Sequence, residues 1–166
     1  PGLSAPGQAQ AAATAAILPQ NLLIVTSPML RCRATAAPYE ARLSARARVE
    51  PRVSEVATPP GLADRRAWLA ETFPWRAGAG GGDWATLSPE LQHWRADLLA
   101  AIRGVEADTA VFSHFIAINA IVGAATGAAE TIVCRPAHAS ITEIAVVGET
   151  LRLISLGRDM EGGDVR

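Results

Sequence analysis

A short strand that runs straight into a histidine constrains the fold of this chain more than any other stretch. Residues 109–113 have strand character, His114 follows at once, and residues 115–122 form an apolar run of helical type. In an open α/β sheet, ligands bind where strands end and helices begin. His114 is therefore predicted to lie at a binding edge of the sheet. The alternative is a core histidine whose ring is satisfied by hydrogen bonds to the backbone.

The order of the remaining elements predicts helices on both faces of a mostly parallel sheet. The continuous apolar run at residues 22–26 is too short for a helix and is typical of a strand that is covered on both faces. Helical and strand patterns alternate along most of the chain, which favours a three-layer α/β/α architecture. The predicted helices span residues 7–18, 29–44, 62–72, 89–103 and 115–122, and the predicted strands span residues 22–26, 48–53, 109–113, 140–147 and 150–156.

Proline and glycine residues set the expected breaks between these elements. Ser27 and Pro28 offer an N-cap and a first-turn proline for the second helix. Pro38 is expected to kink that helix or to break it in two. Residues 77–83 (AGAGGGD) are typical of a flexible connection. Gly148 begins a two-residue loop between the last two strands, which indicates a tight hairpin.

Length and composition limit the class of protein. A chain of 166 residues is long enough for one domain with a proper core, so we expect a single domain over residues 1–158 and a flexible tail over residues 159–166. Hydrophobic residues make up 49% and charged residues 19%, which excludes wholesale disorder.

The net charge of -1 gives no drive towards nucleic acid or an anionic membrane. No apolar run approaches the roughly 20 residues that span a bilayer. The two cysteines, Cys32 and Cys134, fit a reducing compartment, or are simply small buried hydrophobic residues. A cytoplasmic location is expected.

Two strand-to-helix junctions are expected to open on one edge of the sheet. The strand at residues 22–26 leads to Arg31, one turn into the next helix, and the strand at residues 109–113 leads to His114. If these strands are parallel neighbours, both side chains and two helix N-termini converge on one crevice. Backbone N–H groups at a helix start favour an anion, and the arginine fork matches phosphate geometry. The crevice is therefore predicted to bind a phosphate group. For Arg31 alone, the alternative is a solvated helix residue.

Glu55 is a candidate proton donor because it lies in a loop soon after a short strand. Burial would raise the pKa of its carboxyl group and let it protonate a leaving group. The alternative is a surface glutamate. The sequence contains no P-loop, no Gly-x-Ser-x-Gly and no His-Glu-x-x-His.

Four segments resemble the histidine phosphatase superfamily, in its phosphoglycerate-mutase-like branch. Residues 27–36 (SPMLRCRATA) resemble its S-x-x-x-R-A-x-x-T-A segment, and residues 111–114 (VFSH) resemble its second histidine motif. Residues 140–143 (SITE) resemble a strand near its C-terminus, and residues 7–11 (GQAQA) resemble the helix start that follows its first motif. The four segments occur in the family's order over residues 2–158.

The resemblance implies a fold and a role for each candidate residue. In the family, a histidine in an N-terminal Arg-His-Gly motif attacks phosphorus, and water later hydrolyses the phosphohistidine. Arg31 would bind the phosphoryl oxygens, and His114 with the backbone of Phe115 would stabilise the transferring group. Glu55 would be the general acid. The implied substrate is a small phosphorylated molecule, and the implied reaction uses neither a metal nor an organic cofactor. No nucleic acid or membrane partner is expected, and the protein is a possible homodimer.

The chain departs from the family at two points. No Arg-His pair occurs in the 166 residues, so the nucleophile and its central strand are predicted to lie upstream of residue 1. Phe115 stands where the family has a glycine. The short segment between Glu55 and Trp94 favours a phosphatase over a phosphoglycerate-mutase-type phosphoryl transferase. A non-catalytic module that binds a phosphate ligand or another protein is the third interpretation.

Overall fold

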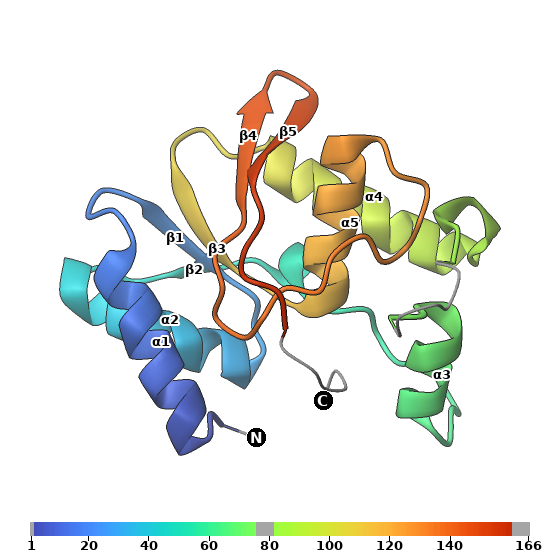
Figure 1. Ribbon diagram of the computed structural model, residues 1–166, viewed down its shortest axis with the longest axis horizontal. Coiled ribbons are helices and arrows are strands. Elements are labelled where there is room, and N and C mark those ends of the chain that lie inside the picture. Colours follow the sequence, from blue (N-terminus) through green and yellow to red (C-terminus); the bar gives the residue numbers. More distant parts are fainter. Residues whose placement is uncertain (1, 76–81, 161–166) are drawn as a thin grey trace.

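The computed structural model describes residues 2–75 and 82–160 of the chain. Its centre is a parallel sheet in the order β2-β1-β3, made of β2 (Arg48–Val49), β1 (Leu23–Thr26) and β3 (Thr109–Phe112). Leu23 pairs with Thr109 and Thr26 with Phe112, so β1 and β3 end at the same edge (Figure 1). The parallel pairing that the site required is confirmed.

Helices cover both faces of this sheet, as the three-layer prediction required. On one face lie α1 (Ala5–Ile17) and α2 (Leu30–Leu43); the two helices pack on each other, and α2 packs on β1. On the other face lie α4 (Pro89–Arg103) and α5 (Phe115–Thr126) (Figure 1). Side chains alternate between the faces, because Ile24 packs in the cluster under α1 and α2 while Val25 packs in the cluster under α4 and α5. This double burial explains the unbroken apolar run of β1.

The helix ends follow local chemistry and correct two predictions. α2 continues through Pro38 as one helix, so of the two predicted outcomes the break into two helices is wrong. α5 runs to Thr126, beyond the predicted end at residue 122, and stops where Gly127 adopts a left-handed φ of 72°. The side chain of Arg42 donates to the carbonyl oxygens of Ala15 and Leu18 at 2.6 and 2.7 Å. Carbonyl oxygens at the C-terminal end of α1, which lack partners within the helix, are thus hydrogen-bonded by a side chain of α2.

The segment after β2 is less regular than predicted. The strand predicted over residues 48–53 ends at Val49, and Pro51–Val53 forms a 3-10 turn. Pro51 has no N–H to give to a sheet ladder, which explains the early end. Glu50 accepts from Arg52 and Arg48 at 2.9 Å, and these bonds hold the pKa of its carboxyl at about 2. α3 (Arg65–Thr72) then begins after Asp64, whose side chain accepts from the N–H of Ala67.

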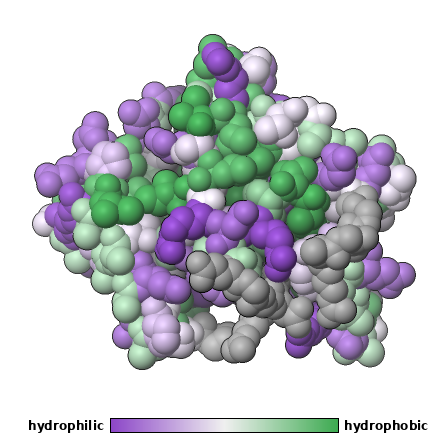
Figure 2. Space-filling model, in the orientation of Figure 1, coloured by the Kyte–Doolittle hydropathy of each residue, from purple (hydrophilic) through white to green (hydrophobic). Residues whose placement is uncertain are grey.

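The predicted hairpin is present, although its first strand begins at residue 143 and not at the predicted residue 140. β4 (Glu143–Val147) pairs antiparallel with β5 (Thr150–Ser155), and Gly148 has the positive φ of 59° that such a turn needs. Leu151 packs into the core next to α5. Figure 2 shows apolar side chains gathered across the face that carries the hairpin, where Val147, Ile154 and Leu156 are exposed. Among the described residues, the hairpin and the parallel sheet are separate sheets.

The predicted flexible stretches lie partly outside the described residues. This holds for residues 77–81 of the glycine-rich connection and for residues 161–166 of the tail. Asp159 forms a bridge with Pro136, and the N–H of Met160 donates to the carbonyl oxygen of Arg135 at 2.7 Å. The start of the predicted tail is therefore held by backbone hydrogen bonds.

Replacing Gly157 by valine is expected to lower the free energy of unfolding by about 1–3 kcal/mol. A Cβ atom at this position would lie 2.9 Å from the Cβ of Ser140 and 3.1 Å from the carbonyl oxygen of Ile141. Neither atom can rotate away, so the backbone must shift. Urea denaturation measures the change, with Gly2→Ala as control because a Cβ there has no atom within 4 Å. Equal stability of the two variants would contradict the close approach.

Candidate active site

His114 lies at the junction between β3 and α5. β3 ends at Phe112, and His114 occupies the N-cap position of α5 with extended backbone (φ -132°, ψ 168°). Its carbonyl oxygen accepts from the N–H of Ile118 at 2.8 Å, which is the first bond of the helix. The side chain is buried, with 5% of the residue exposed. The ring therefore lies at the strand-to-helix junction that the sequence patterns predict.

The guanidinium of Arg31 reaches His114 from the first turn of α2. Its Nη2 atom lies 2.8 Å from Nδ1 of the imidazole, although 83 residues separate the two. The predicted convergence of these side chains is confirmed. A guanidinium can only donate hydrogen bonds, so Nδ1 is the acceptor and carries no proton. The proton of the neutral ring is therefore on Nε2.

The electrostatic environment of His114 disfavours the imidazolium. Burial lowers the pKa of the ring to about 4, and the positive charges of Arg31 and Arg65 act in the same direction. Two cations acting on one buried ring leave a local excess of positive charge. Such a site favours an anion, which would relieve the repulsion.

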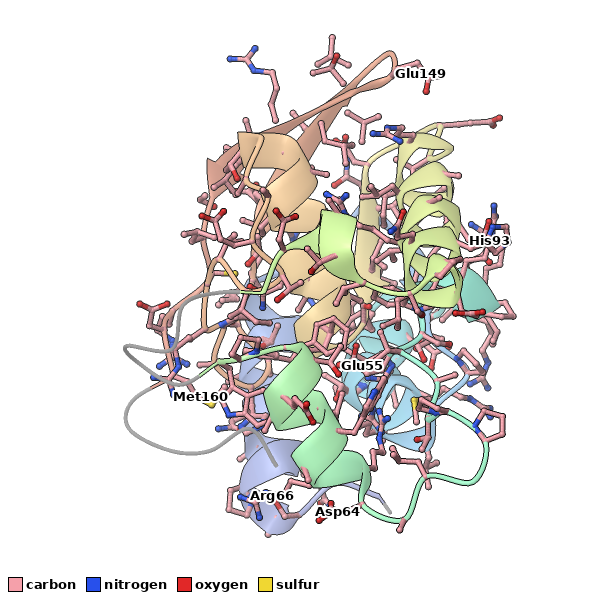
Figure 3. All side chains as sticks on the ribbon, turned by 90° about the vertical axis from the view of Figure 1, so that its right-hand side faces the viewer. Glu55, Asp64, Arg66, His93, Glu149 and Met160 are labelled. Atoms are coloured by element: carbon pink, nitrogen blue, oxygen red, sulfur yellow. The ribbon has the colours of Figure 1, made fainter. Side chains whose placement is uncertain are left out.

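Glu55 lies beside the same junction and is held by two backbone donors. Its Oε2 accepts from the N–H of Ile116 at 3.0 Å, and its Oε1 accepts from the N–H of Val56 at 3.2 Å. The indole of Trp94 donates to the carbonyl oxygen of Ser54, which fixes the loop just before Glu55. Glu55 is half-buried, whereas Figure 3 shows His93 at the outer edge of the molecule. A half-buried carboxyl group held by two backbone N–H donors favours the candidate proton donor over the alternative of a surface glutamate.

Burial raises the pKa of Glu55, and this effect outweighs the groups that stabilise its charge. The opposing groups are the N–H donors of Ile116 and Val56, followed by the positive charges of Arg31 and Arg65. A raised pKa keeps a larger share of the carboxyl protonated at neutral pH. A protonated carboxyl next to an anion site is suited to general acid chemistry.

Three further residues near Arg31, His114 and Glu55 were not predicted from the sequence. The sequence predicts Ser27 as the cap of α2, but the N-cap is Met29, and the Ser27 hydroxyl lies 2.8 Å from Nε2 of His114. Cys32 is buried with its Sγ 3.4 Å from the same nitrogen, and burial raises the pKa of the thiol to about 11. Arg65 donates to the carbonyl oxygen of Val56 from the start of α3. No local pattern marks these contacts, because each one joins separate elements.

One further prediction concerns the backbone of Phe115. The role of the Phe115 backbone in phosphate binding stays a prediction, although the N–H of the next residue, Ile116, is already bonded to Glu55. Within residues 2–75 and 82–160, no group of three or more His, Cys, Asp or Glu side chains could hold a metal ion. In the same residues, no helix is long and apolar enough to cross a membrane.

The comparison with known families agrees with this geometry. The family model of the histidine phosphatase superfamily (branch 1) matches residues 1–159. The chain belongs to the histidine phosphatase superfamily. No curated protein matches the chain.

Solved structures of histidine phosphatase relatives share the fold. The mycobacterial glucosyl-3-phosphoglycerate phosphatase is 22% identical, with a TM-score of 0.71 over 96% of this chain and 89% of that chain. Its complex with inorganic phosphate is 23% identical, with a TM-score of 0.69 over 95% and 88%. A phosphoglycerate mutase from Thermus thermophilus is 21% identical, with a TM-score of 0.56 over 95% and 84%. The phosphoglycerate-mutase-like fold predicted from the sequence is confirmed.

The depressed pKa of His114 predicts that stability falls as pH is lowered from 6.5 to about 4. In this window the unfolded chain binds a proton on the ring that the folded protein does not bind, so protons favour unfolding. A shift of this size corresponds to a loss of about 3 kcal/mol. The raised pKa of Glu55 acts in the opposite direction, so the comparison is made with a His114→Gln variant. Urea denaturation across this pH window should show a shallower loss in the variant, and equal slopes would contradict the assignment.

Proposed function

We propose that this domain belongs to a phosphatase that hydrolyses small phosphate monoesters through a phosphohistidine intermediate. The nucleophilic histidine of this proposal lies upstream of residue 1, as in the family's Arg-His-Gly motif. The observation that carries the proposal is the 2.8 Å contact between Arg31 and His114 at the carboxyl edge of the sheet, with Glu55 bonded to the N–H of Ile116 in the first turn of α5. The phosphatase activity in the name of the mycobacterial relative supports the same reaction class.

The described side chains would divide the work of phosphoryl transfer. Arg31 binds the oxygens of the phosphoryl group, and His114 stabilises the charge that they carry in the transition state. The upstream histidine forms a bond to phosphorus as the bond to the ester oxygen breaks. Glu55 then gives its proton to that leaving oxygen. In the second step Glu55 takes a proton from water as the water oxygen attacks phosphorus, and the histidine–phosphorus bond breaks to release phosphate.

The substrate in this proposal is a small phosphorylated molecule, and the reaction needs neither a metal nor an organic cofactor. The phosphate complex of the mycobacterial relative supports a phosphate-binding site in this fold. The two free thiols, Cys32 and Cys134, fit the reducing conditions of the cytoplasm, which is the proposed location.

The test uses the protein with its encoded residues upstream of Pro1. We expect it to hydrolyse an aryl phosphate and to release inorganic phosphate. Quenching in alkali, where phosphohistidine is stable, should trap a radiolabelled phosphoenzyme. The chain that begins at Pro1 serves as the control and should show neither hydrolysis nor label. An upstream segment without histidine, or hydrolysis without a labelled enzyme, would overturn the proposed mechanism.

A second candidate function is phosphoryl transfer between hydroxyl groups, as in the Thermus mutase of similar fold. It predicts that the phosphate from a phosphorylated donor appears on an added acceptor alcohol rather than as inorganic phosphate. Product analysis by ³¹P NMR separates the two functions. A non-catalytic module predicts phosphate binding with no product of either kind.

A further inference from the structure

We propose that Ser27 is a positioning residue that fixes the orientation of the His114 ring, with Nε2 turned inward and Nδ1 turned towards the bound anion. The proposal rests on the phosphate-binding role of His114 described above, but its test does not need phosphatase activity. It assigns Ser27 a function within the site in place of the helix cap that its sequence position suggests.

The two ring nitrogens of His114 have different partners. Nδ1 accepts from the guanidinium of Arg31 at 2.8 Å, and Nε2 lies 2.8 Å from the hydroxyl oxygen of Ser27. Because Nδ1 carries no proton, Nε2 donates to Ser27. Ser27 is 0% exposed and His114 is 5% exposed, so water does not compete for this bond. The hydroxyl of Ser27 is therefore the oxygen acceptor for the inner nitrogen of the ring.

The other hydrogen bonds of the Ser27 hydroxyl mean that it can only accept a hydrogen bond from His114. Its oxygen accepts from the N–H of Met29 at 3.3 Å and lies 3.4 Å from the hydroxyl oxygen of Ser54. A serine hydroxyl has one proton and two lone pairs. With one lone pair on Met29 and the other on His114, the Ser27 proton is directed to Ser54. This arrangement selects the ring orientation in which a donor nitrogen faces Ser27.

The backbone around Ser27 keeps the hydroxyl in place. The N–H of Ser27 donates to the carbonyl oxygen of Phe112 at 3.0 Å, which extends the β1–β3 ladder by one residue. The hydroxyl of Thr26 donates to the carbonyl oxygen of Ser27 at 3.0 Å. Ser27 is thus tied to the strand that carries His114, so the two side chains keep their relative position.

Ser27 remains a suitable partner when a phosphate takes the place of Arg31 at Nδ1. The guanidinium would then bind the phosphoryl oxygens, and Nδ1 would need a proton to donate to an oxygen. The doubly protonated ring still donates from Nε2, so an acceptor oxygen at Ser27 fits both states of the ring. The charged groups that act on this ring are Arg31 and Arg65, and the carboxylate of Glu55 accepts from the N–H of Ile116, two residues after His114.

Cys32 is the competing partner for Nε2. Its sulfur lies 3.4 Å from this nitrogen and 3.3 Å from the carbonyl oxygen of Ser113, to which the thiol donates. Sulfur is a weak acceptor compared with a hydroxyl oxygen. The shorter contact to Ser27 therefore identifies the residue that holds the ring.

The test measures the protonation of the His114 ring nitrogens by ¹⁵N NMR at neutral pH, in the chain that begins at Pro1. The Arg31→Met variant removes the partner of Nδ1 and should keep the proton on Nε2, because Ser27 still accepts it. The double variant Arg31→Met with Ser27→Ala should give a mixture of tautomers, and Ser27→Thr in place of Ser27→Ala should restore the single form. His93→Gln and His138→Gln assign the other ring signals. A single Nε2–H form in a folded double variant would overturn the proposal.

A second measurement uses the single variants, which disturb the site less. Exchange of the Nε2 proton with solvent should be at least about tenfold faster in Ser27→Ala than in the unaltered chain, since its hydrogen bond is lost. Cys32→Ala should leave the exchange rate unchanged. If Cys32→Ala accelerates exchange and Ser27→Ala does not, the thiol holds the ring and the proposal fails.

Discussion

Replacing His114 by alanine in the protein with its upstream residues is expected to lower kcat/KM on an aryl phosphate by ~100-fold or more. One lost donor to the oxygens of a transition state has a cost of this size. The ring is 5% exposed and is bonded on both nitrogens, so it is held in place before substrate binds. Steady-state kinetics over a range of substrate concentrations separate the effect on kcat from the effect on KM.

The matched control for this experiment is His93→Ala. His93 lies on the exposed side of α4, where it pairs with Asp97 at 3.3 Å, and its side chain is 80% exposed. This substitution should leave the rate unchanged. If His114→Ala also leaves the rate unchanged while the protein stays folded, the role of His114 in transfer is wrong.

Replacing Glu55 by glutamine is expected to lower kcat by ~100-fold or more on an alkyl phosphate and by far less on a nitrophenyl phosphate. An alkoxide needs a proton as it leaves, whereas nitrophenolate leaves without one. Glutamine keeps an oxygen that can accept from the N–H of Ile116 but has no carboxyl proton to give. The ratio of the two rates therefore reports proton donation rather than folding.

Glu90→Gln is the control for this comparison, because Glu90 lies in the exposed first turn of α4. It should change neither rate. An equal loss on both substrates in Glu55→Gln would show that Glu55 acts on binding or on structure, and its assignment as the general acid would be abandoned.

The positions of Arg31 and His114 could be predicted from the local sequence and from the parallel pairing of the two strands that precede them. Residues 109–113 and residues 22–26 each show a strand pattern that ends at a helix start, and parallel strands bring their carboxyl ends to one edge. These two facts are enough to place Arg31 beside His114. The prediction for Glu55 needs the family resemblance, because its own surroundings in the sequence are those of an ordinary loop.

The contacts of Ser27 and Arg65 could not be predicted because they depend on side-chain packing between distant elements. A serine before a proline is typical of a helix cap, yet the hydrogen bond between Ser27 and His114 spans 87 residues. The ends of helices and strands are also hard to predict from the local sequence alone. β2 stops at Val49 because of Pro51, and α2 passes through Pro38 because its other helical bonds and its packing outweigh the local preference.

A crystal structure of the protein with its upstream residues and bound orthovanadate tests the central claim most directly. Vanadate takes the geometry of a transferring phosphoryl group, so its oxygens should lie about 3 Å from the Arg31 guanidinium and from Nδ1 of His114. The upstream histidine should face the vanadium atom from the opposite side to Glu55. Vanadate bound elsewhere, with both Arg31 and His114 beyond hydrogen-bond distance, would contradict the account.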